Sequence, residues 1–179
     1  MVKIRKGKAY HSLKRPYTRI SKYKNQNFVR GGFPAIKITR FDMGDSRKDY
    51  DTTLKLIVTL NMNLRHNALE AARMTSNRLL EKNIANNYHL RLKVFPHHVL
   101  REHTLAAGAG ADRMSTGMSL AFGKPVGIAA RLSEGQTVME LKLNKANLKL
   151  GRDALQRAGR KLPCTCRILT ETTPTPKAE

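Results

Sequence analysis

The chain has no tryptophan, and it has few aromatic residues of any kind, with five tyrosines and five phenylalanines in 179 residues. Half of these ten rings lie within the first 34 residues, outside the segments that show helical or strand periodicity. We therefore expect a core built from aliphatic side chains. A hydrophobic fraction of 40% is enough for a core of modest size.

Long apolar runs are missing as well. No stretch approaches the roughly 18 residues that indicate a transmembrane helix. Residues 1–6 are basic and lack the apolar segment of a secretory signal. We expect a cytoplasmic protein without a membrane-spanning segment. Binding to an anionic membrane surface stays open, although no basic amphipathic helix stands out.

Cysteine is scarce, with Cys164 and Cys166 two positions apart. Residues at this spacing share one face of a strand, where a disulfide between them would be awkward. Free cysteines most often behave as small buried hydrophobic residues. No further ligands follow at a spacing that zinc would need, so we expect reduced thiols and no metal.

Acidic residues are outnumbered, with 13 Asp and Glu against 34 Lys and Arg, a formal charge of +21 and a pI near 10.6. Such a balance says little about the fold and much about the partner. A surface this cationic repels itself unless a polyanion surrounds it. Nucleic acid is therefore the leading partner.

Residues 1–34 form a segment that we call the basic arm. It holds ten basic side chains and no acid, and five aromatic rings are interleaved with them. This pattern suits phosphate contacts combined with stacking on unpaired bases. The alternative is a solvated, disordered basic tail. The basic residues are Lys3, Arg5, Lys6, Lys8, Lys14, Arg15, Arg19, Lys22, Lys24 and Arg30, and the rings include Tyr17.

Hydrophobic periodicity divides the rest of the chain into short elements. The predicted order of strands and helices favours an α+β fold with a mixed or antiparallel sheet packed by two helices. Residues 133–135, short and containing a glycine, are typical of a hairpin turn. Strands are predicted at 36–41, 54–60, 89–95, 127–132, 136–143 and 165–170, and helices at 64–82 and 145–160.

The first predicted helix has an alanine-rich apolar stripe, and its charged residues are expected to lie largely off that stripe. Arg91 and Lys93 alternate with apolar residues in the third predicted strand and could offer charge to phosphate. The histidines of 97–103 lack the spacing of metal ligands, so we expect hydrogen-bonded or RNA-facing imidazoles. The stripe consists of Leu64, Ala68, Ala71, Ala72, Thr75 and Leu79, and the off-stripe residues are Arg65, Glu70, Arg73, Arg78 and Lys82.

Residues 105–131 contain a long loop rich in glycine and alanine. A phosphate-binding loop is excluded because Gly117 precedes Gly123 and Lys124 by one residue too many, and Pro125 replaces the hydroxyl. A dinucleotide fingerprint is excluded because Arg113 stands where its third glycine would be. We therefore expect no cofactor and no enzyme activity. Instead, Arg113 could contact a phosphate or a guanine edge.

Several motifs, in matching order, resemble a family of large-subunit ribosomal proteins, called number sixteen in bacteria and ten-e in archaea and eukaryotes. The resemblance covers roughly residues 10–165 and is of the archaeal type. The motifs are Arg15-Pro16-Tyr17, Phe41-Asp42-Met43-Gly44, Ala68-Leu69-Glu70-Ala71-Ala72-Arg73, Pro96-His97-His98-Val99-Leu100-Arg101, Gly110-Ala111-Asp112-Arg113, Gly117-Met118, Ala121-Phe122-Gly123-Lys124-Pro125, Gly127 and Ala130-Arg131.

The resemblance implies a compact two-layer α/β sandwich that is a structural constituent of the large ribosomal subunit. It implies binding to large-subunit rRNA near the central protuberance, and a loop that reaches toward the peptidyl transferase centre and the A-site and P-site tRNAs. Neighbouring ribosomal proteins would be further partners, and no homo-oligomer is expected. A non-ribosomal RNA-binding or RNA-chaperone module is the alternative.

We accordingly expect three regions: the basic arm, a single α+β domain at 35–170 with a long loop at 104–125, and a polar tail at 171–179. RNA contacts are expected from the basic arm and from residues flanking the loop. Beyond the arm residues named above, these are Arg91, Lys93, His98, Arg101, Lys124 and Arg131. The loop residues expected near tRNA are Gly110, Asp112, Arg113, Gly117 and Met118.

Overall fold

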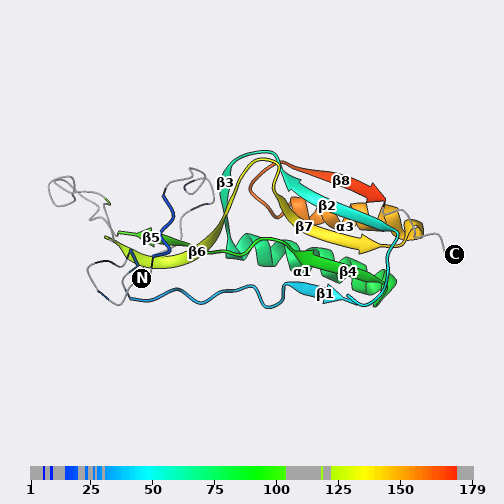
Figure 1. Cartoon of the computed structure of the whole chain (residues 1–179), viewed down its shortest axis with the longest axis horizontal. Coiled ribbons are helices and arrows are strands. Elements are labelled where there is room, and N and C mark those ends of the chain that lie inside the picture. Colours follow the sequence, from blue (N-terminus) through cyan, green and yellow to red (C-terminus); the bar gives the residue numbers. More distant parts are fainter. Residues whose placement is uncertain are drawn as a thin grey trace.

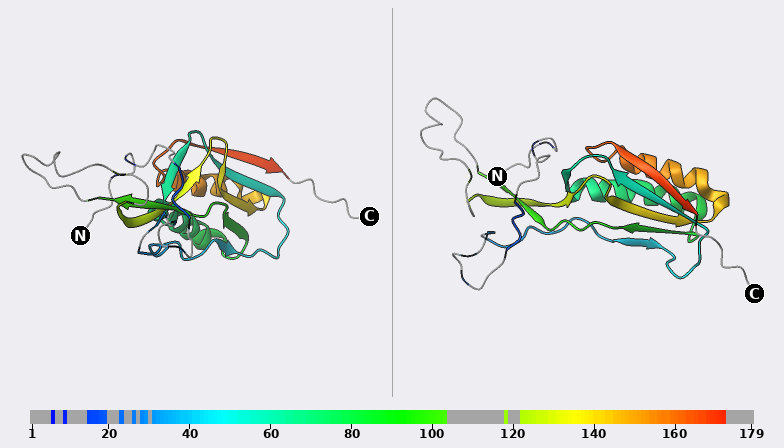
Figure 2. Two further views of the ribbon diagram at one scale, coloured as in Figure 1. Left: turned by 60° about the vertical axis from the view of Figure 1, so that its left-hand side comes forward. Right: turned by 45° about the horizontal axis from the view of Figure 1, so that its top comes forward.

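The computed structural model describes residues 6, 9, 15–19, 23, 26, 28–29, 31–103, 118 and 122–172. Figure 1 shows a body formed by a sheet and two helices, and a narrow second sheet that extends from one end of it. The two further views keep the second sheet apart from the first, so the molecule is elongated (Figure 2). The α+β class predicted from the sequence is confirmed.

The body contains a five-stranded sheet with the order β1-β4-β7-β2-β8, in which all neighbouring strands are antiparallel. Helices α1 (His66–Ile84) and α3 (Leu148–Gly159) pack on each other and cover one face of this sheet. A short 3-10 helix, η3 (Lys145–Asn147), leads into α3. The strands are β1 (Asp42–Gly44), β2 (Thr52–Val58), β4 (Tyr88–Leu92), β7 (Thr137–Leu143) and β8 (Cys166–Thr172).

The core lies between this sheet and the helices. Its largest fully buried side chains are leucines and two methionines, Met62 and Met139, as expected from the shortage of aromatic residues. Gly151 allows α3 to approach the sheet closely, because a Cβ atom there would lie 2.3 Å from Leu143 and 2.9 Å from Leu54. Glycine at position 151 is therefore a packing requirement.

The second sheet, which we call the projecting sheet, has three antiparallel strands in the order β3-β6-β5. They are β3 (Met62–Arg65), β5 (His98–Glu102) and β6 (Lys124–Leu132). The predicted hairpin at 133–135 is wrong, because β6 and β7 belong to different sheets. The turn itself exists, with Gly135 at a φ of 80°, but it carries the chain from one sheet into the other.

The strand predicted at 36–41 is also wrong. Residues 36–40 join neither sheet, and β1 begins at Asp42, directly after the predicted strand ends. The two isoleucines of the alternating pattern do not share a buried face, because Ile38 is buried while Ile36 is 38% exposed. Strands β1, β3 and β5 were not predicted, whereas the other strands and both helices are confirmed with shifted ends. Strand β8 runs to Thr172, two residues further than predicted.

The buried face of α1 departs from the predicted stripe. The residues that face the core lie one position after the predicted ones in most turns of the helix. They are Leu69, Ala72, Ser76 and Leu80. Arg73, expected off the stripe, is buried as well. The stripe was misplaced because the helix is covered by sheet strands and α3 together.

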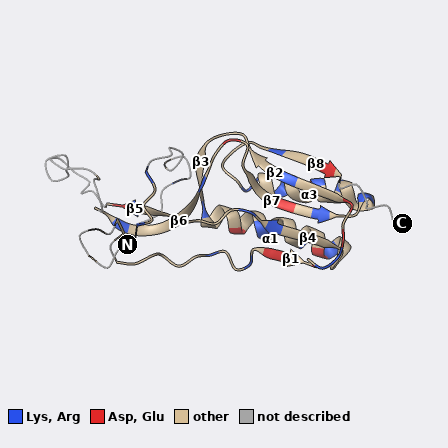
Figure 3. Cartoon of the chain, viewed as in Figure 1, with Lys and Arg blue, Asp and Glu red and all other residues tan. Residues whose placement is uncertain are grey.

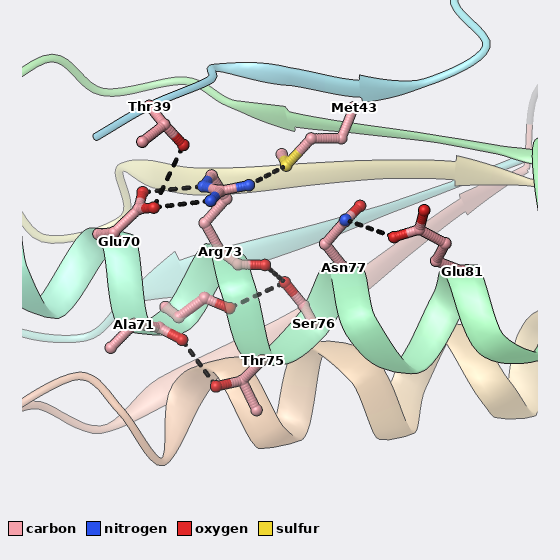
Figure 4. Close-up of polar contacts among 10 residues, drawn as sticks. Thr39, Met43, Glu70, Ala71, Arg73, Thr75, Ser76, Asn77 and Glu81 are labelled. Atoms are coloured by element: carbon pink, nitrogen blue, oxygen red, sulfur yellow. Dashed lines mark hydrogen bonds and ion pairs between the residues drawn. The ribbon is translucent and has the colours of Figure 1, made fainter. Parts of the chain in front are cut away.

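An ion pair explains how Arg73 is buried (Figure 4). Its guanidinium donates to both carboxylate oxygens of Glu70, at 2.6 and 2.8 Å, and to the Met43 sulfur at 3.3 Å. The hydrogen bond from Arg73 lowers the pKa of Glu70. Thr39 also donates to Glu70, at 3.3 Å, so the pair ties the segment before β1 to α1.

Candidate nucleic-acid interface

Strand β5 positions part of the basic arm. β6 lies on one side of β5, and the main chain of Tyr17 lies on the other. The Val99 N–H donates to the Tyr17 carbonyl oxygen at 3.4 Å. The Tyr17 N–H donates in turn to Nδ1 of His98 at 3.1 Å. Residues 15–19 are therefore held along the edge of the projecting sheet rather than hanging free of it.

His98 holds this contact from a buried position, with 6% of its surface exposed. Its ring stacks on the Tyr17 ring, with centroids 5.8 Å apart. Burial, followed by the positive charges of Arg131 and Arg101, lowers the pKa of His98 to about 4. The imidazole is therefore neutral at neutral pH, with Nδ1 as the acceptor that the Tyr17 N–H requires.

Arginines and aromatic rings surround this contact. The Arg101 guanidinium lies 3.6 Å from the Tyr17 ring centroid. The Tyr17 ring meets the Phe28 ring edge to face, and the guanidinium groups of Arg15 and Arg19 lie over Phe28 at 4.9 and 5.8 Å. We call these six residues the ring–arginine cluster: Arg15, Tyr17, Arg19, Phe28, His98 and Arg101.

The cluster has the chemistry of a nucleic-acid contact. A ring holds a guanidinium by its face, which leaves the N–H donors at its edge to reach phosphate. The chain therefore orders long side chains before any ligand arrives, which reduces the entropy cost of binding. Phe28 was absent from the predicted contact residues. Its position between basic residues of the arm was the available signal.

The base of the long loop adjoins the cluster. Arg101 donates to the Phe122 carbonyl oxygen, and the Phe122 ring meets His103 at 4.8 Å. Gly123 has a φ of 102°, and a Cβ atom there would lie 2.6 Å from the Met118 side chain. Glycine is therefore required where the chain enters β6. Met118 is 45% exposed and is the predicted loop residue that the structure describes.

Arg91 and Lys93 lie elsewhere, on the face of the five-stranded sheet opposite the helices, which we call the outer face. Arg91 pairs with Asp42 at 3.4 Å and Lys93 with Glu140 at 3.2 Å. The structure thus does not bring these two residues together with the ring–arginine cluster.

The projecting sheet and the described arm residues next to it carry little acid. Lys124 and Arg131 of β6 are exposed, while the acidic Glu102 of β5 is buried (Figure 3). The remaining predicted residues lie outside the described part of the chain. These are Lys3, Arg5, Lys8, Lys14, Lys22, Lys24, Arg30, Gly110, Asp112, Arg113 and Gly117.

Two further observations concern metals and membranes. No group of three or more His, Cys, Asp or Glu side chains among the described residues could hold a metal ion. No helix in the described ranges is long and apolar enough to cross a membrane.

Comparison with known proteins gives one consistent result. The family described as "Ribosomal protein L16p/L10e" matches residues 14–169. The protein named "Large ribosomal subunit protein uL16" of Picrophilus torridus is 46% identical over 158 residues, 87% of this chain and 89% of its own length. The proteins of the same name from Methanoculleus marisnigri and Archaeoglobus fulgidus are 45% identical (94% and 96% covered) and 40% identical (92% and 91% covered).

Proposed function

The chain belongs to the L16p/L10e family of ribosomal proteins, and from this premise we propose that it is a structural constituent of the large ribosomal subunit. Members of this family are structural components of the ribosome and not enzymes. The observation that carries the proposal for this chain is the ring–arginine cluster, because it presents ordered cationic groups in a region where the described acid is buried.

The finer proposal assigns a role to each end of the molecule. The basic arm and the ring–arginine cluster bind large-subunit rRNA near the central protuberance. The loop at 105–124 reaches toward the peptidyl transferase centre and the A-site and P-site tRNAs. The protein acts as a single copy among neighbouring ribosomal proteins, bound to cytoplasmic ribosomes, and supports translation and subunit maturation.

The cluster would bind rRNA through three arginines that approach one edge of the projecting sheet. The exposed guanidinium groups of Arg15 and Arg19 can each form two parallel hydrogen bonds with a phosphate. His98 contributes by position, because its neutral ring holds the Tyr17 main chain while Arg101 covers the Tyr17 ring. The loop at 104–125 starts from the same place, since Arg101 also contacts Phe122. Binding of rRNA and placement of the loop are therefore linked at Arg101.

Footprinting of reconstituted subunits tests this proposal. Large subunits depleted of the protein are incubated with it at moderate salt, and the rRNA is then probed with hydroxyl radicals. We expect protection of one continuous rRNA site. Equal binding to unrelated RNAs, without a protected rRNA site, would support the RNA-chaperone alternative instead.

Arg101→Lys and Arg91→Lys provide a matched pair of variants for the same experiment. Both keep the charge, but lysine cannot reproduce the flat stacking or the forked hydrogen bonds of arginine. Protection should weaken for Arg101→Lys and stay unchanged for Arg91→Lys. Equal effects of the two substitutions would contradict the role given to the cluster.

A further inference from the structure

The two cysteine thiols lie in contact with each other. The Sγ atoms of Cys164 and Cys166 are 3.6 Å apart, and both side chains are half-buried against the core. The functional proposal makes no use of either thiol. Their contact lies in the body of the molecule, where α3 ends and β8 begins, away from the ring–arginine cluster.

The local backbone accounts for the contact. Cys166 is the first residue of β8, but Cys164 lies before the strand, in the bend that follows Pro163. The objection to a disulfide applied to two residues in one extended strand, and this pair is not so arranged. Gly159 lies beside Cys166, and even a Cβ atom at the glycine would stay 3.9 Å from the cysteine Cβ, so the thiols meet without a bulky neighbour at that point.

The two thiols are chemically unequal. A hydrogen bond from Cys166 lowers the pKa of Cys164, and the same bond together with burial raises the pKa of Cys166. The thiolate form of Cys164 is thus stabilised, because the protonated Cys166 thiol donates a hydrogen bond to it. A thiolate is the attacking species in disulfide exchange, and a second thiol within reach can then displace the first adduct.

We propose that Cys164 and Cys166 form a reversible dithiol–disulfide site that reacts with low-molecular-weight disulfides, with Cys164 as the attacking group and Cys166 as the resolving group. The Cys164 thiolate attacks one sulfur of the small disulfide and releases the other half as a thiol. Cys166 then attacks Cys164, loses its proton and releases the second half. The net reaction oxidises two protein thiols to one disulfide and reduces one small disulfide to two thiols.

Formation of the disulfide requires only a small movement of the two sulfur atoms. The sulfur atoms must approach from 3.6 Å to about 2.05 Å. The loop that closes holds one intervening residue, so the disulfide adds little to the stability of the fold through loop entropy. A disulfide in so small a ring is easily reduced again, which suits a reversible modification and not a permanent crosslink.

The test uses the full-length protein and oxidised glutathione as the probe. After acid quenching, free thiols are labelled with a maleimide and the intact mass is measured. We expect both thiols to be lost together, with a mass decrease of two hydrogen atoms and no retained glutathione, and full recovery with dithiothreitol. Two stable glutathione adducts, or thiols that react with neither reagent, would overturn the proposal.

Two single variants separate the roles of the thiols. Cys166→Ser should accumulate a stable glutathione adduct on Cys164, because nothing displaces it. Cys164→Ser should react roughly tenfold more slowly, since burial still raises the pKa of its remaining thiol, Cys166. A faster reaction of Cys164→Ser would overturn the assigned roles. If a variant fails to fold, the mass change of the wild-type protein still decides whether the disulfide forms.

Discussion

The outer face of the five-stranded sheet and the ring–arginine cluster both present cations, but the partners of those cations differ. On the outer face, Arg91, Lys93 and Lys55 pair with carboxylates of neighbouring strands. In the cluster, Arg15, Arg19 and Arg101 lie on aromatic rings. A carboxylate cancels the charge that it orders, whereas a ring orders a guanidinium and leaves its charge available.

Basic residues therefore have two different uses in this molecule, in salt bridges on the outer face and on aromatic rings in the cluster. Salt bridges on an exposed sheet contribute little to stability, but they reduce the field above the face. A guanidinium that rests on a ring is not neutralised by that ring, and Glu102, the acidic residue of β5, is buried. Net charge alone therefore does not locate an RNA contact, and the partner of each cation has to be considered.

The largest expected effect comes from removing the three arginines of the cluster together. Substitution of Arg15, Arg19 and Arg101 by alanine should lower rRNA affinity roughly 1,000-fold, or about 4 kcal/mol, because three charge-assisted contacts are lost. The salt dependence of binding, plotted on logarithmic axes, should flatten by about two to three units. Filter binding over a range of salt concentrations measures both quantities.

The matched control for that experiment replaces Lys55, Arg91 and Lys93 by alanine. It removes the same formal charge from the outer face, where each cation already has a carboxylate partner. Its effect on affinity should be at least tenfold smaller. Equal losses for the two triple variants would remove the distinction between the regions.

Acid should affect the cluster before it affects the body. The pKa of His98 is lowered to about 4 in the folded protein, so its contribution to stability is complete above its unfolded pKa near 6.5. That contribution is lost as pH falls from 6.5 to 4, by up to about 3 kcal/mol. His66, which accepts a hydrogen bond from the Lys37 N–H, also has a lowered pKa and acts in the same direction.

The pH experiment compares two probes. The pKa of Glu70 is lowered from 4.5, so the stability that its ion pair gives α1 is present above pH 4.5 and is lost only below it. Hydrogen exchange between pH 6.5 and 4.5 should therefore rise first at Tyr17 and Val99, while the part of α1 that follows Glu70 remains protected, beyond the first turn that holds His66. His98→Asn, which keeps an acceptor but does not titrate, should remove this early change. A simultaneous rise of hydrogen exchange at Tyr17, at Val99 and in α1 would contradict this prediction.

Substitutions at two glycines, one in the body and one at the base of the loop, should have smaller and more local effects. Gly151→Val should destabilise the fold by about 2 kcal/mol, because the added atoms meet Leu143 and Leu54 in a packed core. Gly123→Ala should leave most of the unfolding free energy unchanged but disturb the base of the loop, where φ is positive and Met118 is close. Thermal unfolding measures the first effect, and protease cleavage of the loop measures the second.

The smallest effect is expected on the outer face. Lys93→Ala breaks the pair with Glu140, but Lys142 lies 4.0 Å from the same carboxylate. The unfolding free energy should change by less than about 1 kcal/mol. Urea titration is sufficient to detect a larger loss, which would mean that the outer face is a structural element.

Sequence periodicity predicted the elements whose pattern is long enough to be read. Helices α1 and α3 and strands β2 and β7 are such elements. Strands β1 and β3 were missed because three or four residues carry too little pattern, and β5 was missed because its residues do not alternate between apolar and polar. The hairpin prediction failed for a different reason, since the turn at Gly135 is compatible with either a hairpin or a change of sheet.

The sequence predicted which residue types form the site, but not how these residues are arranged in space. The basic residues and rings of the arm indicated RNA binding, and the structure gathers Arg15, Tyr17 and Arg19 with Arg101. The bond between Tyr17 and His98 joins residues 81 positions apart, which no local pattern encodes. Likewise, the spacing of Glu70 and Arg73 permits an ion pair, but its burial depends on Thr39 and Met43 passing over α1.

Strand β6 has a consequence for how force passes through the molecule. It starts at Lys124, at the base of the loop, and ends at Leu132, fully buried in the core of the body. Nine residues of strand span about 30 Å. A pull applied at Lys124 is therefore transmitted along this strand to the leucine-rich core, which resists it together with the hydrogen bonds of β6 to β3 and β5.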